Sequence, residues 1–175
     1  MEYLNKANFY QRCKIGYWKD QQRRWEYIGI VVNILRENSP RSVLEIGNCG
    51  LPLTSISDTM DLYYHDKKLT YHQDAAKTPW DIPGKKYNFV VALQVFEHLD
   101  NSRIKQIDVF NECCRVGDNV IISIPYRWKP RIFCDGCNHG SINDSTVLRW
   151  ASQRQWDYEK LTGSKHKRKI YWWKV

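Results

Sequence analysis

A strand-like run near position 45 ends in a turn with two glycines, and this turn is the first feature of the sequence that is suited to ligand binding. The turn and the residue that leads into it contain Glu45, Gly47, Asn48 and Gly50. Glycine adopts backbone conformations that other residues avoid, and it lets a ligand lie directly against the main chain. Because Gly-x-x-Gly occurs in many turns, the segment indicates a site only in combination with residues further along the chain.

Acidic residues come later in the sequence, at positions that suit a ribose and a purine base. Asp66 lies 21 positions after the glutamate of that turn, and an acidic side chain about 20 residues on can accept both hydroxyl protons of a ribose. Asp58 and Asp61 compete for this role, and a plain turn aspartate is the alternative for Asp66. Asp74 and its neighbour Ala75 come after another short β-like run, where a side chain can reach the edge of an adenine.

The segment 94–99 reads Gln-Val-Phe-Glu-His-Leu and directly follows the clearest strand-like run of the chain, 87–93. Gln94 and Phe96 therefore fall just beyond the end of a predicted strand. Histidine is the natural general base for a proton that must be removed near neutral pH, so His98 is a candidate catalytic residue. The alternative is that His98 caps or packs against the next helix.

A second histidine, His139, completes a Cys-x-x-Cys-x-His run with Cys134 and Cys137. A closed zinc site needs four ligands. No fourth ligand lies nearby in the sequence, although Cys113 or Cys114 can approach in space. We therefore expect no metal, and we keep His139 as a second candidate catalytic residue.

Hydrophobic periodicity predicts the elements that must position these residues. Spacings of three and four indicate helices, and short apolar or β-branched runs between turn residues indicate strands. Helices are predicted over 20–37, 51–57, 101–115 and 141–153, the last with Asn143 or Asp144 as its N-cap. Strands are predicted over 42–46, 61–65, 69–72, 87–93 and 119–124, and a hairpin pairs 156–161 with 169–174.

Strands that alternate with helices and then end in a hairpin predict an α/β, Rossmann-like chain. Its sheet is expected to be mainly parallel, with helices on both faces and a C-terminal antiparallel hairpin. Ligands of such sheets bind beyond the carboxyl ends of the strands, which is where the candidate residues fall. The length of 175 residues fits one domain.

Together these features resemble the class I S-adenosylmethionine-dependent methyltransferases. In that family the first strand ends in an acidic-x-Gly-x-Gly turn, an acidic residue ends the second, an aspartate follows the third, and many small-molecule members carry Glu-His-Leu after the fourth. Residues 43–50, Asp74 and 89–99 match best, and the resemblance extends weakly over 42–125. Two departures stand out: the turn reads Gly-Asn-Cys-Gly-Leu-Pro-Leu, and the stretch between the turn and Asp74 is short for the usual helix.

The resemblance implies S-adenosylmethionine as the methyl donor and S-adenosylhomocysteine as the product. The cofactor-binding residues that it implies are Glu45, Gly47, Asn48, Gly50, Asp66, Asp74, Ala75, Gln94 and Phe96. It also divides the single domain 1–175 into an N-terminal helical lid or cap (1–38), a cofactor-binding core (42–125) and an acceptor-side loop, helix and hairpin (126–175). The aromatic residues Tyr10, Tyr17, Trp18 and Trp25 are the candidates for a lid.

Methyl transfer from a sulfonium is an in-line displacement, so aligning the acceptor and excluding water are the main tasks expected of the protein. The net charge of +8 suggests a negatively charged partner. Arg127, Lys129 and Arg131, in the loop expected after the fifth strand, suit a phosphate or carboxylate on a small-molecule acceptor.

Three other functions are weighed against this one. A nucleic-acid (RNA) methyltransferase is compatible with the charge and the eight tryptophans, but no Asn/Asp-Pro-Pro-Tyr-type segment follows residues 87–93. A non-catalytic binding module that kept the fold is compatible with the irregular glycine turn. A nicotinamide-dependent oxidoreductase is disfavoured because Gly-x-Gly-x-x-Gly is absent.

The first twenty residues contain no apolar run and no stretch is long enough to span a bilayer, so we expect a cytoplasmic protein with no membrane span.

Overall fold

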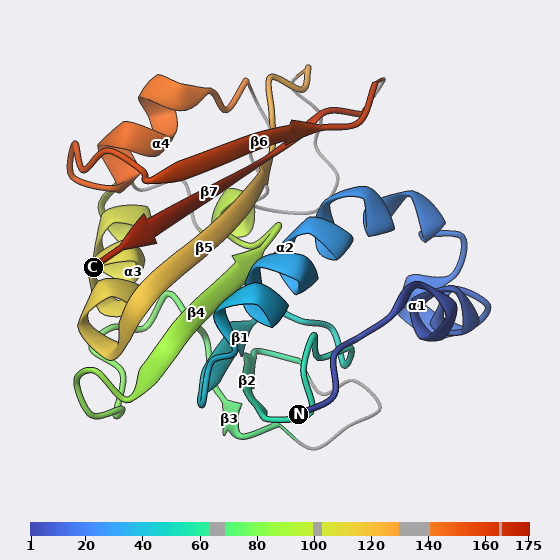
Figure 1. The fold of residues 1–175 in the computed structure, drawn as a ribbon. Coiled ribbons are helices and arrows are strands. Elements are labelled where there is room, and N and C mark those ends of the chain that lie inside the picture. The colour runs from blue at the N-terminus through green and yellow to red at the C-terminus, as the bar shows by residue number, and fades with distance from the viewer. Residues whose placement is uncertain (64–68, 100–102, 130–140, 165) are drawn as a thin grey trace.

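The computed structural model describes residues 1–63, 69–99, 103–129, 141–164 and 166–175. Within these ranges one sheet contains β1 (Val43–Ile46), β2 (Ser57–Asp61), β3 (Tyr71–His72), β4 (Tyr87–Leu93), β5 (Gly117–Pro125), β6 (Tyr158–Thr162) and β7 (Arg168–Lys174). Their order across the sheet is β3-β2-β1-β4-β5-β7-β6 (Figure 1). Strands β1 to β5 pair in parallel, whereas β7 is antiparallel to both β5 and β6. The predicted Rossmann-like α/β class and its C-terminal hairpin are confirmed.

Helices cover both faces of this sheet, as predicted (Figure 1). The α-helices of the described ranges are α1 (Lys6–Arg12), α2 (Trp25–Asn38), α3 (Arg103–Val116) and α4 (Asp144–Trp150), and the 3₁₀ helices are η1 (Gly16–Trp18), η2 (Gln22–Arg24) and η3 (Phe96–His98). Helices α1 and α2 lie on one face, and α3 and α4 lie on the other. No helix within the described ranges combines the length and the apolar character that a membrane span requires.

The central strand β4 shows why the sheet is buried on both sides. Its side chains alternate between the two faces: Phe89 and Val91 pack into the core beneath α1 and α2, whereas Val90 and Ala92 pack into the core beneath α3 and α4. All four are at most 3% exposed. A continuous apolar run is what a parallel strand between two helical layers requires, so this strand was predicted at its observed bounds.

Local capping explains where two of the predicted helices begin or end. Helix α4 starts after Asn143, whose side chain accepts a hydrogen bond from the Thr146 N–H at 3.1 Å. Asn143 is one of the two residues that were predicted as its N-cap. Helix α2 ends at Asn38, because the next residue, Ser39, adopts a left-handed conformation with φ 45° and Pro40 then prevents continuation.

The connection between β1 and β2 differs from its prediction. Residues 51–57 were expected to form a short helix, but residues 47–56, all of which the structure describes, contain none. The second strand spans Ser57–Asp61, whereas the prediction placed it over 61–65, of which residues 64 and 65 lie outside the described residues. Its register is set by parallel pairing with β1, in which Ile46 lies opposite Met60, and this pairing outweighs the low intrinsic β-propensity of the strand itself.

Candidate functional site

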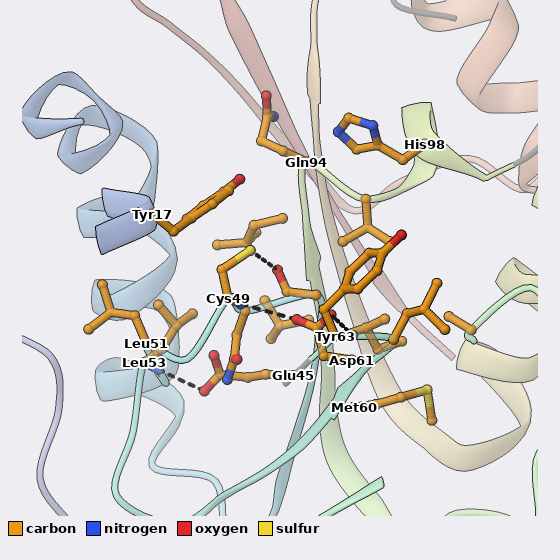
Figure 2. A pocket seen from close by; sticks show the side chains of 18 of the residues that line it. Tyr17, Glu45, Cys49, Leu51, Leu53, Met60, Asp61, Tyr63, Gln94 and His98 are labelled. Atoms are coloured by element: carbon orange, nitrogen blue, oxygen red, sulfur yellow. Dashed lines mark hydrogen bonds between the residues drawn. The ribbon is translucent and has the colours of Figure 1, made fainter. Parts of the chain in front are cut away.

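A cavity of about 440 Å³ opens beyond the carboxyl ends of β1, β2 and β4 (Figure 2). Small-molecule sites span about 300–1,000 Å³. The side chains and backbone that line it come from the N-terminal segment, from α2 and from the three strand ends: Leu4, Tyr17, Trp18, Arg24, Tyr27, Ile28, Glu45, Ile46, Gly47, Asn48, Cys49, Leu51, Leu53, Met60, Asp61, Leu62, Tyr63, Gln73, Asp74, Ala75, Val91, Leu93, Gln94, Val95, His98 and Leu99. This is the position at which ligands bind in open α/β sheets.

Gly47, Asn48 and Cys49 of the glycine turn after β1 line the cavity, whereas Gly50, the other glycine predicted to bind the cofactor, lies outside the lining. Gly47 and Gly50 have φ angles of 66° and 73°, in the left-handed region. A Cβ atom on Gly47 would lie 2.6 Å from Cγ2 of Val95, closer than two carbon atoms can approach. Glycine at this position therefore satisfies both the backbone conformation and the close packing against the segment after β4.

Glu45 holds the connection between the turn and β2. Its side chain is buried, and Oε1 accepts a hydrogen bond from the Leu53 N–H at 2.7 Å (Figure 2). Burial raises the pKa of this carboxyl to about 7, although hydrogen bonds from Ser57, Leu53, Thr54 and Asn48 act to lower it. The Glu45 carboxyl thus anchors the chain where the predicted helix is absent.

Asn48 presents a buried amide beside this carboxyl. Its Oδ1 accepts a hydrogen bond from the Gly50 N–H at 3.0 Å, which stabilises the turn. Its Nδ2 is buried beside the Glu45 carboxyl and acts to lower the pKa of that group, although their geometry falls short of a full hydrogen bond. Because Asn48 also lines the cavity, its amide is a polar group that a ligand can contact.

Asp61 occupies the carboxyl end of β2, where an acidic residue was sought. Its Oδ2 accepts from the Cys49 N–H at 3.3 Å and its Oδ1 accepts from the Tyr63 N–H at 3.2 Å, so it bridges the glycine turn and the chain beyond β2 (Figure 2). Asp58, the other competitor, lies outside the lining and accepts from the Tyr87 hydroxyl at 2.6 Å. Asp66, the expected ribose ligand, lies outside the described residues.

Asp74 and Ala75 lie in the lining after β3, at the place that the sequence indicated. Asp74 also makes a local turn, because its Oδ1 accepts from the Ala76 N–H at 2.9 Å. The carboxylate therefore shapes the loop and faces the cavity at the same time.

Gln94 begins the segment after β4 in a left-handed conformation, with φ 59°. Its N–H donates to the Ser123 carbonyl at 2.9 Å and its Nε2 donates to the Ser123 hydroxyl at 3.1 Å, which fixes the side chain between β4 and β5. Phe96, in contrast, is completely buried against Trp150 at a ring distance of 5.9 Å and does not line the cavity. The structure therefore places Phe96 in the core below the site.

Figure 2 shows one end of the cavity between Tyr17, Gln94 and His98, with the His98 ring directed toward Gln94. We call this the Gln94 end. The other candidate catalytic residue, His139, lies outside the described residues, as do Cys134 and Cys137. Within the described ranges, no group of three or more histidine, cysteine or acidic side chains is arranged to hold a metal ion.

The N-terminal segment covers the cavity with two of the four aromatic residues considered for a lid. Tyr17 and Trp18 line it, and the Trp18 indole N–H donates to the Cys49 carbonyl of the glycine turn at 3.0 Å. Tyr10 and Trp25 do not line it. The segment is therefore attached to the glycine turn by a specific hydrogen bond.

Two cationic side chains that the sequence analysis did not single out also belong to this region. Arg24 lines the cavity, and Arg168 at the start of β7 donates from Nε to Oε1 of Gln94 at 3.1 Å. Neither arginine falls in a recognisable motif. The one sequence feature that could have indicated them is that each lies in a stretch rich in lysine and arginine, near positions 12–24 and 165–169. Of the three residues proposed for anion binding, Arg127 and Lys129 are exposed and do not line the cavity, and Arg131 lies outside the described residues.

No protein-family model matches the sequence, and no curated protein matches it either. Solved structures do share its fold. Magnesium protoporphyrin IX methyltransferase from Synechocystis PCC 6803, solved with S-adenosylhomocysteine, aligns with a TM-score of 0.62 at 13% identity over 95% of this chain and 92% of that one. The N-methyltransferase NodS from Bradyrhizobium japonicum WM9, also with S-adenosylhomocysteine, gives 0.60 at 12% identity over 94% and 97%.

An S-adenosylmethionine-dependent methyltransferase from Clostridium acetobutylicum gives a TM-score of 0.59 at 8% identity over 93% of both chains. In all three alignments almost the whole of both chains is superposed. The described part of the chain therefore shares the fold of these methyltransferases over most of its length.

Proposed function

We propose that this chain is an S-adenosylmethionine-dependent methyltransferase that acts on a small or medium-sized acceptor. One observation carries the proposal. The glycine turn after β1 and the carboxylate of Asp61 after β2 are joined by the Cys49 N–H bond at the mouth of a 440 Å³ cavity. A bare turn beside an acidic residue on the next strand suits a nucleoside with its ribose hydroxyls exposed.

The residues present fit this cofactor. We assign Asp61, in place of Asp66, to the ribose hydroxyls, because it stands at the end of β2 and faces the cavity. Asp74 and Ala75 are assigned to the adenine edge. Gly47 and the buried Asn48 amide donor are assigned to the polar part of the ligand that lies against the turn.

The cofactor supplies an electrophilic methyl group, so the protein needs to align the acceptor and exclude water. Trp18 and Tyr17 exclude water on the side of the N-terminal segment. Gln94, fixed by Ser123, orients the acceptor at the Gln94 end. His98 at the same end is placed to take a proton from an acceptor that must lose one.

The connection after β1 favours a second candidate function. Residues 47–56 contain no helix, so the glycine turn lacks the helix N-terminus that commonly supports an anionic ligand group. A non-catalytic module that binds the nucleoside without turnover is compatible with this difference.

The first test is calorimetric titration with S-adenosylhomocysteine, with NADH as the off-target ligand. We expect micromolar binding of S-adenosylhomocysteine, which corresponds to about −8 kcal/mol, and no binding of NADH. Asp61→Asn should weaken binding at least about tenfold, which is roughly 1.4 kcal/mol. Asp118→Asn, at the opposite end of the sheet in β5, is the matched control and should bind like the wild type.

A second measurement separates the two candidates. The protein is incubated with S-adenosylmethionine and pooled small-molecule extracts, and S-adenosylhomocysteine formation is followed by mass spectrometry. Formation that is lost in Asp61→Asn supports the enzyme. Binding of S-adenosylhomocysteine without any formation supports the non-catalytic module, and absence of binding contradicts both.

A further inference from the structure

Arg24 and Arg168 approach the Gln94 end of the cavity from opposite elements. Arg24, in η2, donates to the Tyr17 hydroxyl at 3.4 Å and stacks over the Tyr17 ring at 5.5 Å. Arg168, the first residue of β7, contacts Oε1 of Gln94 and stacks over the Tyr27 ring at 5.2 Å. Arg24 itself lines the cavity, whereas Arg168 lies outside the lining and contacts two residues that belong to it, Gln94 and Tyr27.

The two arginines are close enough to repel each other. Burial lowers the pKa of Arg168, and the charge of Arg24 lowers it further. Both side chains are half-buried, and within the described ranges neither forms a salt bridge with a carboxylate. Their partners are aromatic rings and neutral oxygens, so the Gln94 end has a local excess of positive charge.

Two carboxyl groups interact electrostatically with Arg168, and neither cancels this excess. Glu97 is 3% exposed, and burial raises its pKa to about 8, so it is mainly neutral at pH 7. Glu26 is exposed on the first turn of α2, where solvent screens its charge. A pair of guanidinium groups in this setting favours a ligand oxyanion, which accepts hydrogen bonds from several N–H groups at once.

We propose that Arg24 and Arg168 bind an oxyanion, a carboxylate or a phosphate, on a small-molecule methyl acceptor whose apolar or aromatic body lies among Tyr17, Tyr27 and Trp128. The proposal rests on the proposed function and adds a substrate class to it. Trp128 is included because its ring lies 5.1 Å from the Arg168 guanidinium. The anion-binding residues are therefore Arg24 and Arg168, in place of the exposed Arg127 and Lys129.

A small molecule fits these observations better than a nucleic acid. The arginines are half-buried at the end of one cavity, whereas binding along a polynucleotide requires several exposed cations that track the backbone. Arg168 is also held by Gln94, a residue fixed by Ser123 at the end of β4. A fixed guanidinium is suited to one anionic group at one position.

The test uses phenyl phosphate and benzoate as anionic probes, with phenol and benzamide as their neutral counterparts. Each is titrated by calorimetry into the protein alone and into the protein saturated with S-adenosylhomocysteine. We expect at least one anionic probe to bind tenfold or more tightly than its neutral counterpart. The better probe identifies the anion as phosphate or carboxylate.

Arg168→Met and Arg24→Met should each weaken binding of that probe about tenfold or more and change the S-adenosylhomocysteine affinity less than about threefold. Arg36→Met is the matched control, because Arg36 also stacks over a tyrosine ring, Tyr3, but lies at the far end of α2. It should bind the probe like the wild type. Circular dichroism shows whether each variant is folded.

Equal binding of anionic and neutral probes, or unchanged probe binding in both cavity variants, overturns the proposal. So does a short single-stranded RNA that displaces the probe and binds far more tightly. Failure of S-adenosylhomocysteine to bind contradicts the proposed function instead, and the titrations without it still report whether the two arginines hold an anion.

Discussion

Gly47 and Gly16 have similar backbone conformations, with φ of 66° and 58°, but different surroundings. A Cβ on Gly47 meets Val95 at 2.6 Å, whereas a Cβ on Gly16 meets nothing within 4 Å. We expect Gly16→Ala to cost about 1 kcal/mol, from the left-handed conformation alone. Gly47→Ala should cost about 2–4 kcal/mol, because overpacking adds to the same strain. Urea unfolding followed by circular dichroism measures both, and equal losses would show that the contact with Val95 is readily relieved.

The site residues differ in how far the sequence could identify them. Glycines at 47 and 50 are recognisable because few residues tolerate their backbone angles. The acidic residue at the end of the second strand could not be identified from the sequence, because spacing alone did not distinguish Asp66 from Asp61. That choice depends on the register of β2 against β1, which is a property of the folded sheet. The role of Arg168 was harder still to predict, because Arg168 and its partner Gln94 are 74 positions apart in the sequence.

At the scale of elements, burial decided which strands and helices could be predicted. β4 and β5 are apolar on both faces and were found within two residues of their bounds. β2 reads Ser-Asp-Thr-Met-Asp and has little intrinsic preference for a strand. It forms because β1 pairs with it and Glu45 holds the preceding connection, and neither interaction leaves a local pattern in the sequence.

Asp144 links helix α4 to the terminal hairpin. It accepts hydrogen bonds from Lys169 Nζ at 2.6 Å, from the Tyr171 hydroxyl at 2.7 Å and from the Tyr126 hydroxyl at 2.9 Å. Asp144→Ala leaves the buried Lys169 ammonium with only the partly exposed Glu159 as its carboxylate partner in the described ranges. We expect a loss of about 1–3 kcal/mol in the free energy of unfolding.

Asp118→Ala is the matched control for this prediction. Asp118 pairs with Lys85 at 4.0 Å, and both side chains are almost half exposed, so its removal should cost no more than about 1 kcal/mol. Urea denaturation at pH 7 compares the two variants with the wild type. Similar losses would mean that the links from Asp144 do not stabilise the packing of α4 on the hairpin.

At the scale of the whole molecule, the buried carboxyl groups of Glu45 and Glu97 affect global stability in the same direction. Burial raises the pKa of Glu45 to about 7 and that of Glu97 to about 8. A carboxyl with a raised pKa stays protonated in the folded state at pH values where the unfolded chain has already lost the proton. Stability should therefore fall as the pH rises from about 4.5, the ordinary value, through these two pKa values.

Glu97 allows this effect to be isolated, because its Oε2 has no hydrogen-bond partner in the described part of the chain and glutamine has the same shape. We expect Glu97→Gln to match the wild type near pH 5, where the carboxyl is protonated, and to exceed its stability at pH 8 by a few kcal/mol, because glutamine cannot ionise. Urea unfolding at pH 5, 6.5 and 8 measures the difference, with the exposed Glu37→Gln as control. A constant difference between Glu97→Gln and the wild type across this range would mean that Glu97 ionises as readily in the folded protein as in the unfolded chain. The two arginines near it would then face a full negative charge, and the positive excess at the Gln94 end would be reduced accordingly.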